Sequence, residues 1–318
     1  MRLRASLVAV CVLLSAEFGS TGLAAQSGGA GKAVLVTGAS TGIGRKITEV
    51  LAAKGYHVYA GARKPADIAE LSRIPNVEGI GLDVTVQSDI DAAVETVRKG
   101  GRGLYGLVNN AGAGLRSPLI EAEEKDLVFL FDVNVYGPWR MTKAFAPMLI
   151  DAKGRIANIS SIAGILSPPM LGAYSMTKHA LEAYGDGLGA ELARFGVKVS
   201  LVEPGNYNSA ISATGIARMG DLDALAAKSR YPDEILALKR MGNREQYPEP
   251  DDVAAAVDHA LSDPNPRVRY MVVPAAGEAL VTIRKAVDEL VQLNQGHRFT
   301  ISRDSLLKLI DESIARNR

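Results

Sequence analysis

The chain has 318 residues, of which 47% are hydrophobic, and a formal net charge of +1 at pH 7. This composition suits a protein with one large core, and the near-neutral charge gives no reason to expect nucleic acid or an anionic membrane as a partner. The one cysteine, Cys11, excludes a disulfide or a thiolate metal site within the chain, and the four histidines lack metal-ligand spacing, so we predict no metal.

The first 25 residues have the pattern of a signal peptide or membrane-targeting segment. Arg2 and Arg4 precede an apolar stretch over residues 5–16, and small residues end at Ala25, where cleavage is expected. The stretch is shorter than the about 20 residues that span a membrane, so a retained anchor is the second choice, and a later translation start is the third. Residues 26–31 form a linker. The pattern predicts an exported (periplasmic or secretory) or membrane-associated protein, with a cytoplasmic location as the alternative.

A glycine-rich turn follows the first predicted strand, at residues 33–37. Gly38, Gly42 and Gly44 lie between this strand and a segment whose apolar residues recur at helical spacing. Glycines allow the backbone to approach a pyrophosphate closely, and the following helix offers unpaired N–H groups and the positive end of its dipole. An ordinary glycine-rich turn is the alternative, but a strand, turn and helix in register favour a dinucleotide-binding loop.

Six more strands are expected, with helices between them. They cover residues 57–61, 77–82, 104–109, 155–160, 197–203 and 269–274. This alternation indicates an α/β fold, a doubly wound parallel sheet of Rossmann type with seven strands and helices on both faces. Residues 206–250 lack a strong period and suit a loop-and-helix lid over the substrate. Residues 276–318 predict a C-terminal helical extension, two amphipathic helices that dock onto the core rather than onto a membrane or partner.

Tyr174, Lys178 and Ser161 form a candidate site for carbonyl reduction. Four residues apart on a helix, Tyr174 and Lys178 project from one face. At roughly 5 Å and an effective dielectric of about 20, the lysine charge favours the phenolate by about 3 kcal/mol, so the tyrosine can exchange protons near neutral pH. Ser161 can donate a hydrogen bond to a carbonyl oxygen, whereas Ser160 would point to the opposite face of the strand. A lone Tyr-x-x-x-Lys pair is common by chance, so its weight depends on the other motifs.

Together these motifs resemble the classical short-chain dehydrogenase/reductase family, in its retinol, steroid and hydroxybutyrate dehydrogenase-like branch, over about residues 32–275. Residues 109–112 resemble its N-N-A-G segment, and residues 203–206, E-P-G-N, the pattern of that branch. The resemblance implies a catalytic tetrad of Asn134, Ser161, Tyr174 and Lys178. It implies cofactor contacts from Thr37, Gly38, Ser40, Thr41, Gly42, Ile43, Gly44, Arg63, Asp83, Val84, Asn110, Ala111, Gly112, Tyr174, Lys178, Pro204, Gly205 and Ser209.

The resemblance also implies roles for the tetrad. Tyr174 is the acid or base, Lys178 also holds the ribose hydroxyls, and Asn134 positions a water that links Lys178 to solvent. A local amide bond within a helix is the alternative for Asn134. The expected reaction transfers a hydride between NADP(H) and a carbonyl or secondary alcohol on a hydrophobic substrate that is steroid-, retinoid- or ketone-like. A 3-oxoacyl thioester reductase and a non-catalytic NADP-sensing regulator are the main alternatives, ahead of a sugar epimerase and a structural Rossmann module.

Within the cofactor set, Asp83 and Val84 resemble the pair that borders the adenine, and Pro204 with Gly205 resembles the segment along the nicotinamide. Ser209 stands where the family usually has threonine. Its hydroxyl is retained, so the resemblance still implies a contact with the carboxamide.

The residues after the second strand bear on the choice between NADP and NAD. An acidic residue there would bind the adenosine 2′-hydroxyl and exclude a phosphate, but this chain has Ala62, Arg63 and Lys64. Arg63 therefore favours NADP, with NAD possible and a solvated loop cation as the alternative reading. Thr41 weakens the preference, because many phosphate-preferring relatives have a basic residue there.

Partners are expected to be a small hydrophobic carbonyl or alcohol substrate and further copies of the chain. Apolar side chains are expected to line the substrate pocket, namely Leu166, Pro168, Pro169, Met170, Tyr207, Ile211, Ile216 and Met219. Residues 126–149 and 172–195 predict long helices, which in the family pack against a second subunit. The resemblance thus implies a homodimer or homotetramer, with simple core packing as the alternative.

Overall fold

The computed structural model describes residues 29–241 and 245–317. The predicted targeting segment at residues 1–25, which contains Cys11, lies outside the described residues, as do residues 26–28 of the predicted linker at residues 26–31. Within the described part, no helix is long and apolar enough to cross a membrane.

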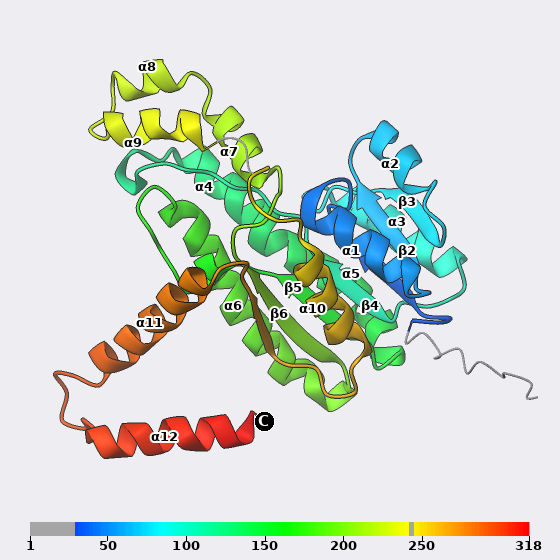
Figure 1. The fold of residues 1–318 in the computed structure, drawn as a ribbon. Helices are drawn as coiled ribbons and strands as arrows, with labels where there is room; N and C mark the ends of the chain where they lie inside the picture. The colour runs from blue at the N-terminus through cyan, green and yellow to red at the C-terminus, as the bar shows by residue number, and fades with distance from the viewer. Residues whose placement is uncertain (1–28, 242–244, 318) are drawn as a thin grey trace, which may run out of the picture.

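All seven predicted strands are present in one parallel sheet, in the order β3-β2-β1-β4-β5-β6-β7 (Figure 1). The strands are β1 Ala33–Val36, β2 His57–Ala62, β3 Val77–Gly81, β4 Gly106–Asn109, β5 Arg155–Ile159, β6 Lys198–Pro204 and β7 Arg269–Val272. Side chains alternate between the faces, so Val34 and Val36 join one core cluster while Ala33 and Leu35 join the other. The predicted seven-stranded parallel sheet is confirmed.

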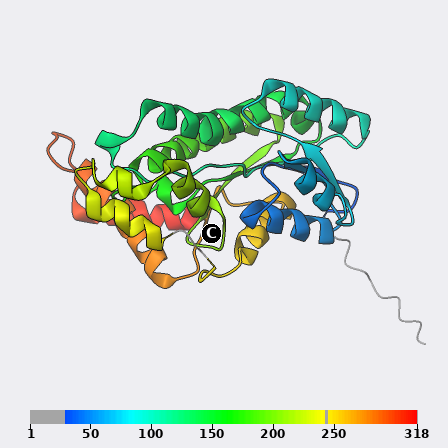
Figure 2. The ribbon, with the colours of Figure 1, turned by 90° about the horizontal axis from the view of Figure 1, so that it is seen from above.

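Helices cover both faces of this sheet (Figure 2). They include α1 Gly42–Ala53, α2 Pro65–Leu71, α3 Gln87–Lys99, α4 Glu124–Phe131, α5 Gly137–Asp151, α6 Gly172–Leu192 and α10 Asp251–Ser262. Ile47 of α1 and Val257 of α10 are buried on one face, and Phe145 of α5 and Leu192 of α6 on the other. The predicted doubly wound α/β architecture is therefore confirmed.

The two predicted long helices differ in their continuity. The helix predicted over residues 126–149 is interrupted, because α4 passes into a π-helical turn at Asp132–Tyr136 before α5 begins. The helix predicted over residues 172–195 is present as α6 followed by a 3-10 turn at Ala193–Phe195. A π-helical turn inside a helix often marks a functional position, and this one contains Asn134.

The sheet changes its winding direction between β1 and β4. Strands β2 and β3 lie on one side of β1, and β4 to β7 lie on the other. The chain leaves the carboxyl ends of β1 and β4 toward opposite faces, and in open α/β sheets ligands bind at such a switch point. The glycine turn begins after β1 and the N-N-A-G segment begins at the end of β4, so the fold brings these motifs together.

The predicted lid segment consists of short helices, α7 Ile211–Met219, α8 Leu222–Ala226 and α9 Pro232–Ala237. Arg218 fastens α7 to α4, because its Nε lies 3.1 Å from Asp126 Oδ1 and its guanidinium lies 3.8 Å from the centroid of the Phe129 ring. The segment therefore packs against α4 near the carboxyl edge of the sheet (Figure 1).

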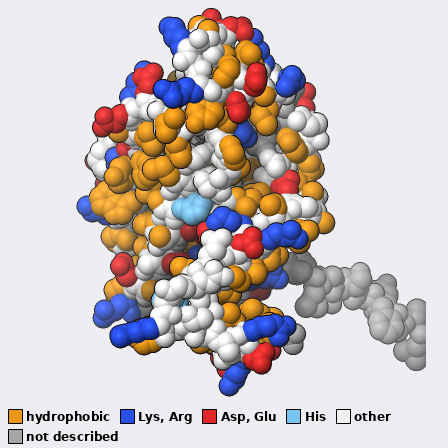
Figure 3. Space-filling model, turned by 90° about the vertical axis from the view of Figure 1, so that its left-hand side faces the viewer, with side chains coloured by type: hydrophobic (Ala, Val, Ile, Leu, Met, Phe, Trp, Pro, Cys, Tyr) orange, Lys and Arg blue, Asp and Glu red, His pale blue; other side chains and the backbone are white. Residues whose placement is uncertain are grey.

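The C-terminal extension forms the two predicted helices, α11 Ala276–Leu293 and α12 Arg303–Arg316, but the prediction that they dock onto the core is wrong. Only Thr282 of α11 and no described residue of α12 is buried. Leu280 is 60% exposed and Val287 48%. In Figure 1 α11 leads away from the body of the molecule, and Figure 3 shows hydrophobic side chains on this side of it.

Candidate active site

The glycine turn is shaped by positions that only glycine can occupy. Gly38 and Gly42 have φ angles of +65° and +53°, in the left-handed region. A Cβ at position 44 would lie 2.2 Å from the Gly38 carbonyl oxygen and 2.3 Å from Asn110 Nδ2. Close approach of Gly44 therefore lets the first turn of α1 lie directly against the loop, as the sequence predicted.

Thr37 and Asn110 join the glycine turn to the N-N-A-G segment. The backbone N–H groups of Asn110 and Ala111 both donate to Thr37 Oγ1, at 2.9 Å. Asn110 Nδ2 donates in return to the carbonyl oxygens of Thr37 and Gly38, at 2.9 and 3.0 Å. These reciprocal bonds fix the two loops relative to each other, and Ala111 leaves no room for a Cβ at position 38, since its Cα would lie 2.8 Å away.

Tyr174 and Lys178 lie one turn apart on α6, as predicted. Lys178 Nζ is 5.6 Å from the centroid of the Tyr174 ring, close to the separation assumed from helix geometry. Tyr174 is half-buried, whereas Lys178 is buried and donates from Nζ to the carbonyl oxygen of Ile159 at 2.8 Å. Burial lowers the pKa of Lys178 to about 8, although the negative charge of Glu182 acts in the opposite direction.

Asn134 is bonded over long distances in sequence, not locally within its helix. Its Oδ1 accepts from the backbone N–H of Ala113 at 2.8 Å, and its Nδ2 donates to the Ala113 carbonyl oxygen at 2.9 Å. The same Nδ2 donates to Thr177 Oγ1 at 3.0 Å. Asn134 thus connects the loop after β4 to the turn of α6 that carries Tyr174 and Lys178.

Ser161 follows β5 and faces the end of β6. Its Oγ accepts from the backbone N–H of Ala163 at 3.0 Å and donates to the Pro204 carbonyl oxygen at 3.4 Å. Ser160 is buried, and its Oγ would lie 3.1 Å from a Cβ added at Gly164. The half-buried Ser161 is therefore the serine that stays within reach of a ligand, in agreement with the strand-alternation prediction.

The predicted adenine edge contains one long ion pair. Arg63 Nη1 lies 3.9 Å from Asp83 Oδ2, and the Arg63 side chain is 73% exposed. Asp83 Oδ1 accepts from the backbone N–H and the hydroxyl of Thr85, at 2.9 and 2.7 Å. Val84 is buried beside this turn. The fold thus brings Arg63 and Asp83 together across the ends of β2 and β3.

The segment after β6 returns to the glycine turn. A Cβ at Gly42 would lie 3.2 Å from Ser209 Cβ, so Ser209 lies against the glycine turn. Gly205 donates its backbone N–H to the Val272 carbonyl oxygen at 2.8 Å. Pro204, Gly205 and Ser209 are therefore all at the carboxyl edge of the sheet. Ser40, Thr41 and Ile43 lie within the glycine turn and the start of α1, and Gly112 lies beside Asn134 Oδ1.

Two contacts in this region were not predicted, and one predicted pocket residue lies elsewhere. Thr177, between Tyr174 and Lys178, bridges to Asn134, and only its position inside the Y-S-M-T-K run could have signalled it. Glu278 at the start of α11 accepts from the backbone N–H and Nδ2 of Asn206, at 2.9 and 3.1 Å. Tyr207 is 2% exposed within the core cluster of α1 and α10, so its predicted place in the substrate wall is wrong.

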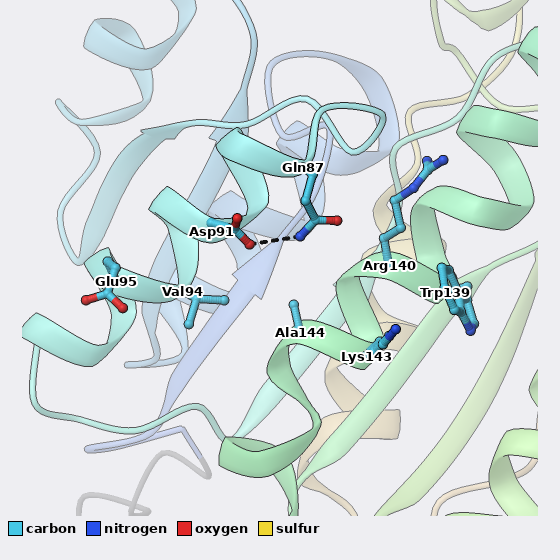
Figure 4. A pocket seen from close by; sticks show the side chains of 8 residues that line it. All are labelled: Gln87, Asp91, Val94, Glu95, Trp139, Arg140, Lys143 and Ala144. Carbon is cyan, nitrogen blue, oxygen red and sulfur yellow. Dashed lines mark hydrogen bonds between the residues drawn. The ribbon is translucent and has the colours of Figure 1, made fainter.

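A separate hollow of about 530 Å³ lies between α3 and α5 (Figure 4). Its lining consists of Gln87, Asp91, Val94, Glu95, Trp139, Arg140, Lys143 and Ala144. None of these side chains belongs to the candidate tetrad or to the glycine turn, and convergent polar groups define the site better than the size of a hollow. Among the described residues, no group of three or more His, Cys, Asp or Glu side chains could hold a metal ion.

Comparison with known proteins assigns the family. The family model for the short chain dehydrogenase matches residues 32–219, more than half of the chain. The chain belongs to the short-chain dehydrogenase/reductase family. This short-chain dehydrogenase/reductase is 35% identical over 264 residues to mitochondrial D-beta-hydroxybutyrate dehydrogenase of Rattus norvegicus, covering 76% of each chain. It is 33% identical over 257 residues to retinol dehydrogenase 5 of Mus musculus, covering 74% of this chain and 79% of the relative.

Solved structures of other short-chain dehydrogenases share the fold. A Burkholderia phymatum member in complex with NAD has a TM-score of 0.71 and 25% identity, covering 86% of this chain and 99% of that one. A metagenomic member in complex with NADP has a TM-score of 0.61 and 28% identity, covering 78% and 99%. The short-chain dehydrogenase/reductase described here is therefore an oxidoreductase of the NAD(P)-binding kind, in the branch that its E-P-G-N segment indicated.

Proposed function

We propose that this short-chain dehydrogenase/reductase uses NADP(H) to interconvert a carbonyl and a secondary alcohol on a hydrophobic substrate, with Tyr174 as the acid or base. The observation that carries the proposal is the junction at α6, where Tyr174 lies beside the buried Lys178 and Asn134 fastens the turn between them. Asn134, Thr177, Tyr174 and Lys178 meet there from two separate segments, which a purely structural module would not need.

The residues around the glycine turn fit a dinucleotide. No side chain caps the N-terminus of α1, which leaves first-turn N–H groups for a phosphate. The missing Cβ atoms at positions 38, 42 and 44 let the backbone approach such a group closely. Arg63, exposed beside Asp83, supports NADP over NAD, because a guanidinium pairs well with a 2′-phosphate. A bound nicotinamide cofactor would supply or accept the hydride.

Each residue of the tetrad then has a separate task. In the reducing direction Tyr174 donates its phenolic proton to the carbonyl oxygen, and in the oxidising direction it accepts that proton. Lys178 stabilises the phenolate by its positive charge and can hold ribose hydroxyls. Ser161 donates a hydrogen bond to the same oxygen, an interaction typically worth a few kcal/mol as charge develops. Asn134 keeps the turn of α6 in place and is proposed to position a water next to Lys178.

An apolar substrate is supported by the surroundings of the short helices. Met170, Ile216 and Met219, three of the predicted wall residues, pack against the cluster formed by α8 and α9. Met219 also packs against the cluster that contains Ala173, the neighbour of Tyr174. Apolar side chains therefore continue from the short helices to the start of α6. The relatives are named for hydroxybutyrate and for retinol, and this lining favours the larger and more hydrophobic of these substrates.

A spectrophotometric screen tests the proposal. The purified protein would be given NADPH or NADH with retinal, steroid ketones, aliphatic ketones and 3-oxoacyl thioesters. We expect oxidation of NADPH with a retinoid, steroid or aliphatic ketone. Turnover restricted to the thioesters would replace the substrate class with the acyl alternative. Tight NADPH binding without turnover of any carbonyl would favour a cofactor-sensing regulator.

We also propose that the protein acts as a homodimer or homotetramer through the helices on the α5 and α6 side. Large hydrophobic side chains are exposed there, including Trp139 at 47% and Met176 at 45%. Such side chains at a helix surface suit an isologous contact between two copies. Light scattering on the purified protein tests this, and a monomeric mass at micromolar concentration would contradict it.

A further inference from the structure

Two buried carboxyl groups lie behind the proposed tetrad and have no part in the steps above. Glu182 follows Lys178 by one turn of α6, and Glu203 precedes Pro204 at the end of β6. The Glu203 side chain is 3% exposed and the Glu182 side chain 11%. Ionised carboxylates at such depth are costly unless cations or hydrogen-bond donors compensate them.

The compensation comes from one arginine at the sheet edge. Arg269 Nε on β7 lies 3.2 Å from Glu182 Oε2 and 3.5 Å from Glu203 Oε1. Its Nη2 lies 2.6 Å from Asp186 Oδ2, one turn further along α6. Arg269 therefore faces three carboxyl groups from a partly exposed position, and Lys178 is the buried cation on α6.

Charge balance disfavours full ionisation of this cluster. Lys178 and Arg269 supply two positive charges, while Glu182, Asp186 and Glu203 would supply three negative ones. Helix α10 packs on the opposite face of the sheet, where Asp251 and Asp258 pair with Lys46 and Lys54 of α1 and its C-cap. Glu278 of α11 is engaged by Asn206. The Arg269 and Asp186 side chains are 42% and 52% exposed, so solvent screens their charges. The burial of Glu182 and Glu203 is therefore what most disfavours ionising both, and one proton on this pair lowers that cost.

Each of the two glutamates has a carboxyl oxygen that could carry that proton. Within the described structure, Glu182 Oε1 and Glu203 Oε1 are buried and receive no hydrogen bond. Gly164 packs closely against Glu182, since a Cβ added at position 164 would lie 2.8 Å from Glu182 Cγ. Burial, the largest cause, and the negative charge of Glu182 together raise the pKa of Glu203 to about 7, while Arg269 acts in the opposite direction. Two close carboxyl groups in such surroundings titrate as a pair.

We propose that Glu182 and Glu203 hold one proton between them and act as a positioning pair for Lys178, whose charge then follows the protonation of the pair. When the shared proton leaves, the pair, of which Glu182 lies one helical turn from Lys178, carries a second negative charge, which favours the ammonium form of Lys178. Lys178 then stays charged to higher pH than burial alone would allow, which maintains the proposed support for the Tyr174 phenolate. The role of the pair in turnover rests on the proposed function, whereas the shared proton does not.

The shared proton can be tested without any substrate. Carbon-13 NMR of glutamate-labelled protein, or isotope-edited infrared spectroscopy, would follow carboxyl protonation between pH 5 and 9. We expect one buried carboxylic acid to lose its proton near neutral pH in the unmodified protein, and this titration to be absent in both Glu182→Gln and Glu203→Gln. Two carboxylates already ionised at pH 5 would overturn the proposal.

The effect of the glutamate pair on Lys178 is tested by a separate measurement. Nitrogen-15 NMR of the Lys178 ammonium should show its titration at a pH lower by at least about half a unit in Glu182→Gln. The basic limb of the pH profile for kcat/KM should move in the same direction. Glu191→Gln removes the same charge from an exposed position of the same helix and should move neither. An unchanged Lys178 titration in folded Glu182→Gln would overturn the role, while absent turnover in the unmodified protein would count only against the proposed function.

Discussion

Asn134 donates a hydrogen bond from its side-chain amide to Thr177 Oγ1, 3.0 Å away, and Thr177 donates in turn to the Tyr174 carbonyl oxygen at 2.7 Å. A residue of the π-helical turn is thereby fastened to the turn of α6 that carries Tyr174 and Lys178. Two positions of the candidate tetrad, Asn134 and Tyr174, are therefore joined through a fifth side chain, Thr177.

Replacing Thr177 with valine should loosen this junction. The change keeps the shape of the side chain but leaves the Asn134 amide without one buried acceptor, which costs about 1–3 kcal/mol of the free energy of unfolding. We expect turnover to fall by about tenfold, because Tyr174 is less well held. Thr177→Ser keeps both hydrogen bonds and should retain most of the activity. Thermal unfolding and kcat measured on both variants check this, and equal loss in valine and serine variants would contradict it.

Replacing Gly44 with alanine should damage the cofactor loop. The added Cβ would lie 2.2 Å from the Gly38 carbonyl oxygen, so the loop must shift at a cost of about 1–3 kcal/mol. Affinity for NADPH should fall at least about tenfold, as measured by fluorescence titration. Gly187→Ala is the matched control, because nothing lies within 4 Å of a Cβ there and alanine favours the helix by up to about 1 kcal/mol. Unchanged NADPH affinity in Gly44→Ala would count against the loop as the phosphate site.

Replacing Ala62 with aspartate should move the cofactor preference toward NAD. The carboxylate would repel a 2′-phosphate near Arg63 and accept a hydrogen bond from a ribose hydroxyl. The ratio of kcat/KM for NADPH to that for NADH should fall at least about tenfold, or roughly 1.4 kcal/mol. Ala62→Asn keeps the size of the new side chain without its charge and should have a smaller effect. An unmodified enzyme that already prefers NADH would show the NADP proposal to be wrong.

The stability of the protein should depend on pH through Glu203. Its pKa is raised to about 7 in the folded state, above 4.5, so the folded state binds more protons between these values. The contribution is fully present below about pH 4.5 and is lost as the pH rises through about 7, up to about 3 kcal/mol at about 1.4 kcal/mol per pH unit. Lys178, with its pKa lowered to about 8, acts only at higher pH and in the opposite direction.

Glu203→Gln removes this dependence. Urea unfolding between pH 5 and 7.5 should show the variant gaining stability relative to the unmodified protein as the pH rises. A constant difference across that range would contradict the raised pKa of Glu203.

The motif residues could be predicted because each depends on local structure. Tyr174 and Lys178 are related by helix geometry alone, and Gly38 to Gly44 by a strand, a turn and a helix that follow one another directly. The parallel sheet was equally accessible, since short apolar runs typical of buried strands alternate with helices along the chain.

Features that depend on tertiary packing were beyond the same reasoning. Glu182, Glu203 and Arg269 come from α6, β6 and β7, and nothing in their spacing signals that they meet. The apolar faces of α11 and α12 indicated docking onto the core, but among the described residues of these helices only Thr282 is buried. Tyr207 has the composition of a pocket residue, yet packing beside α1 and α10 buries it.

Tyr174→Phe tests the central claim most directly. The variant removes only the phenolic oxygen, so the fold and the NADPH affinity should be unchanged within about twofold, while kcat for the best carbonyl substrate should fall at least about a hundredfold. Stopped-flow measurement of NADPH oxidation, with thermal unfolding and NADPH titration on the same samples, gives all three quantities. A folded, cofactor-binding Tyr174→Phe protein that retains the kcat of the unmodified enzyme would remove Tyr174 from the acid or base role.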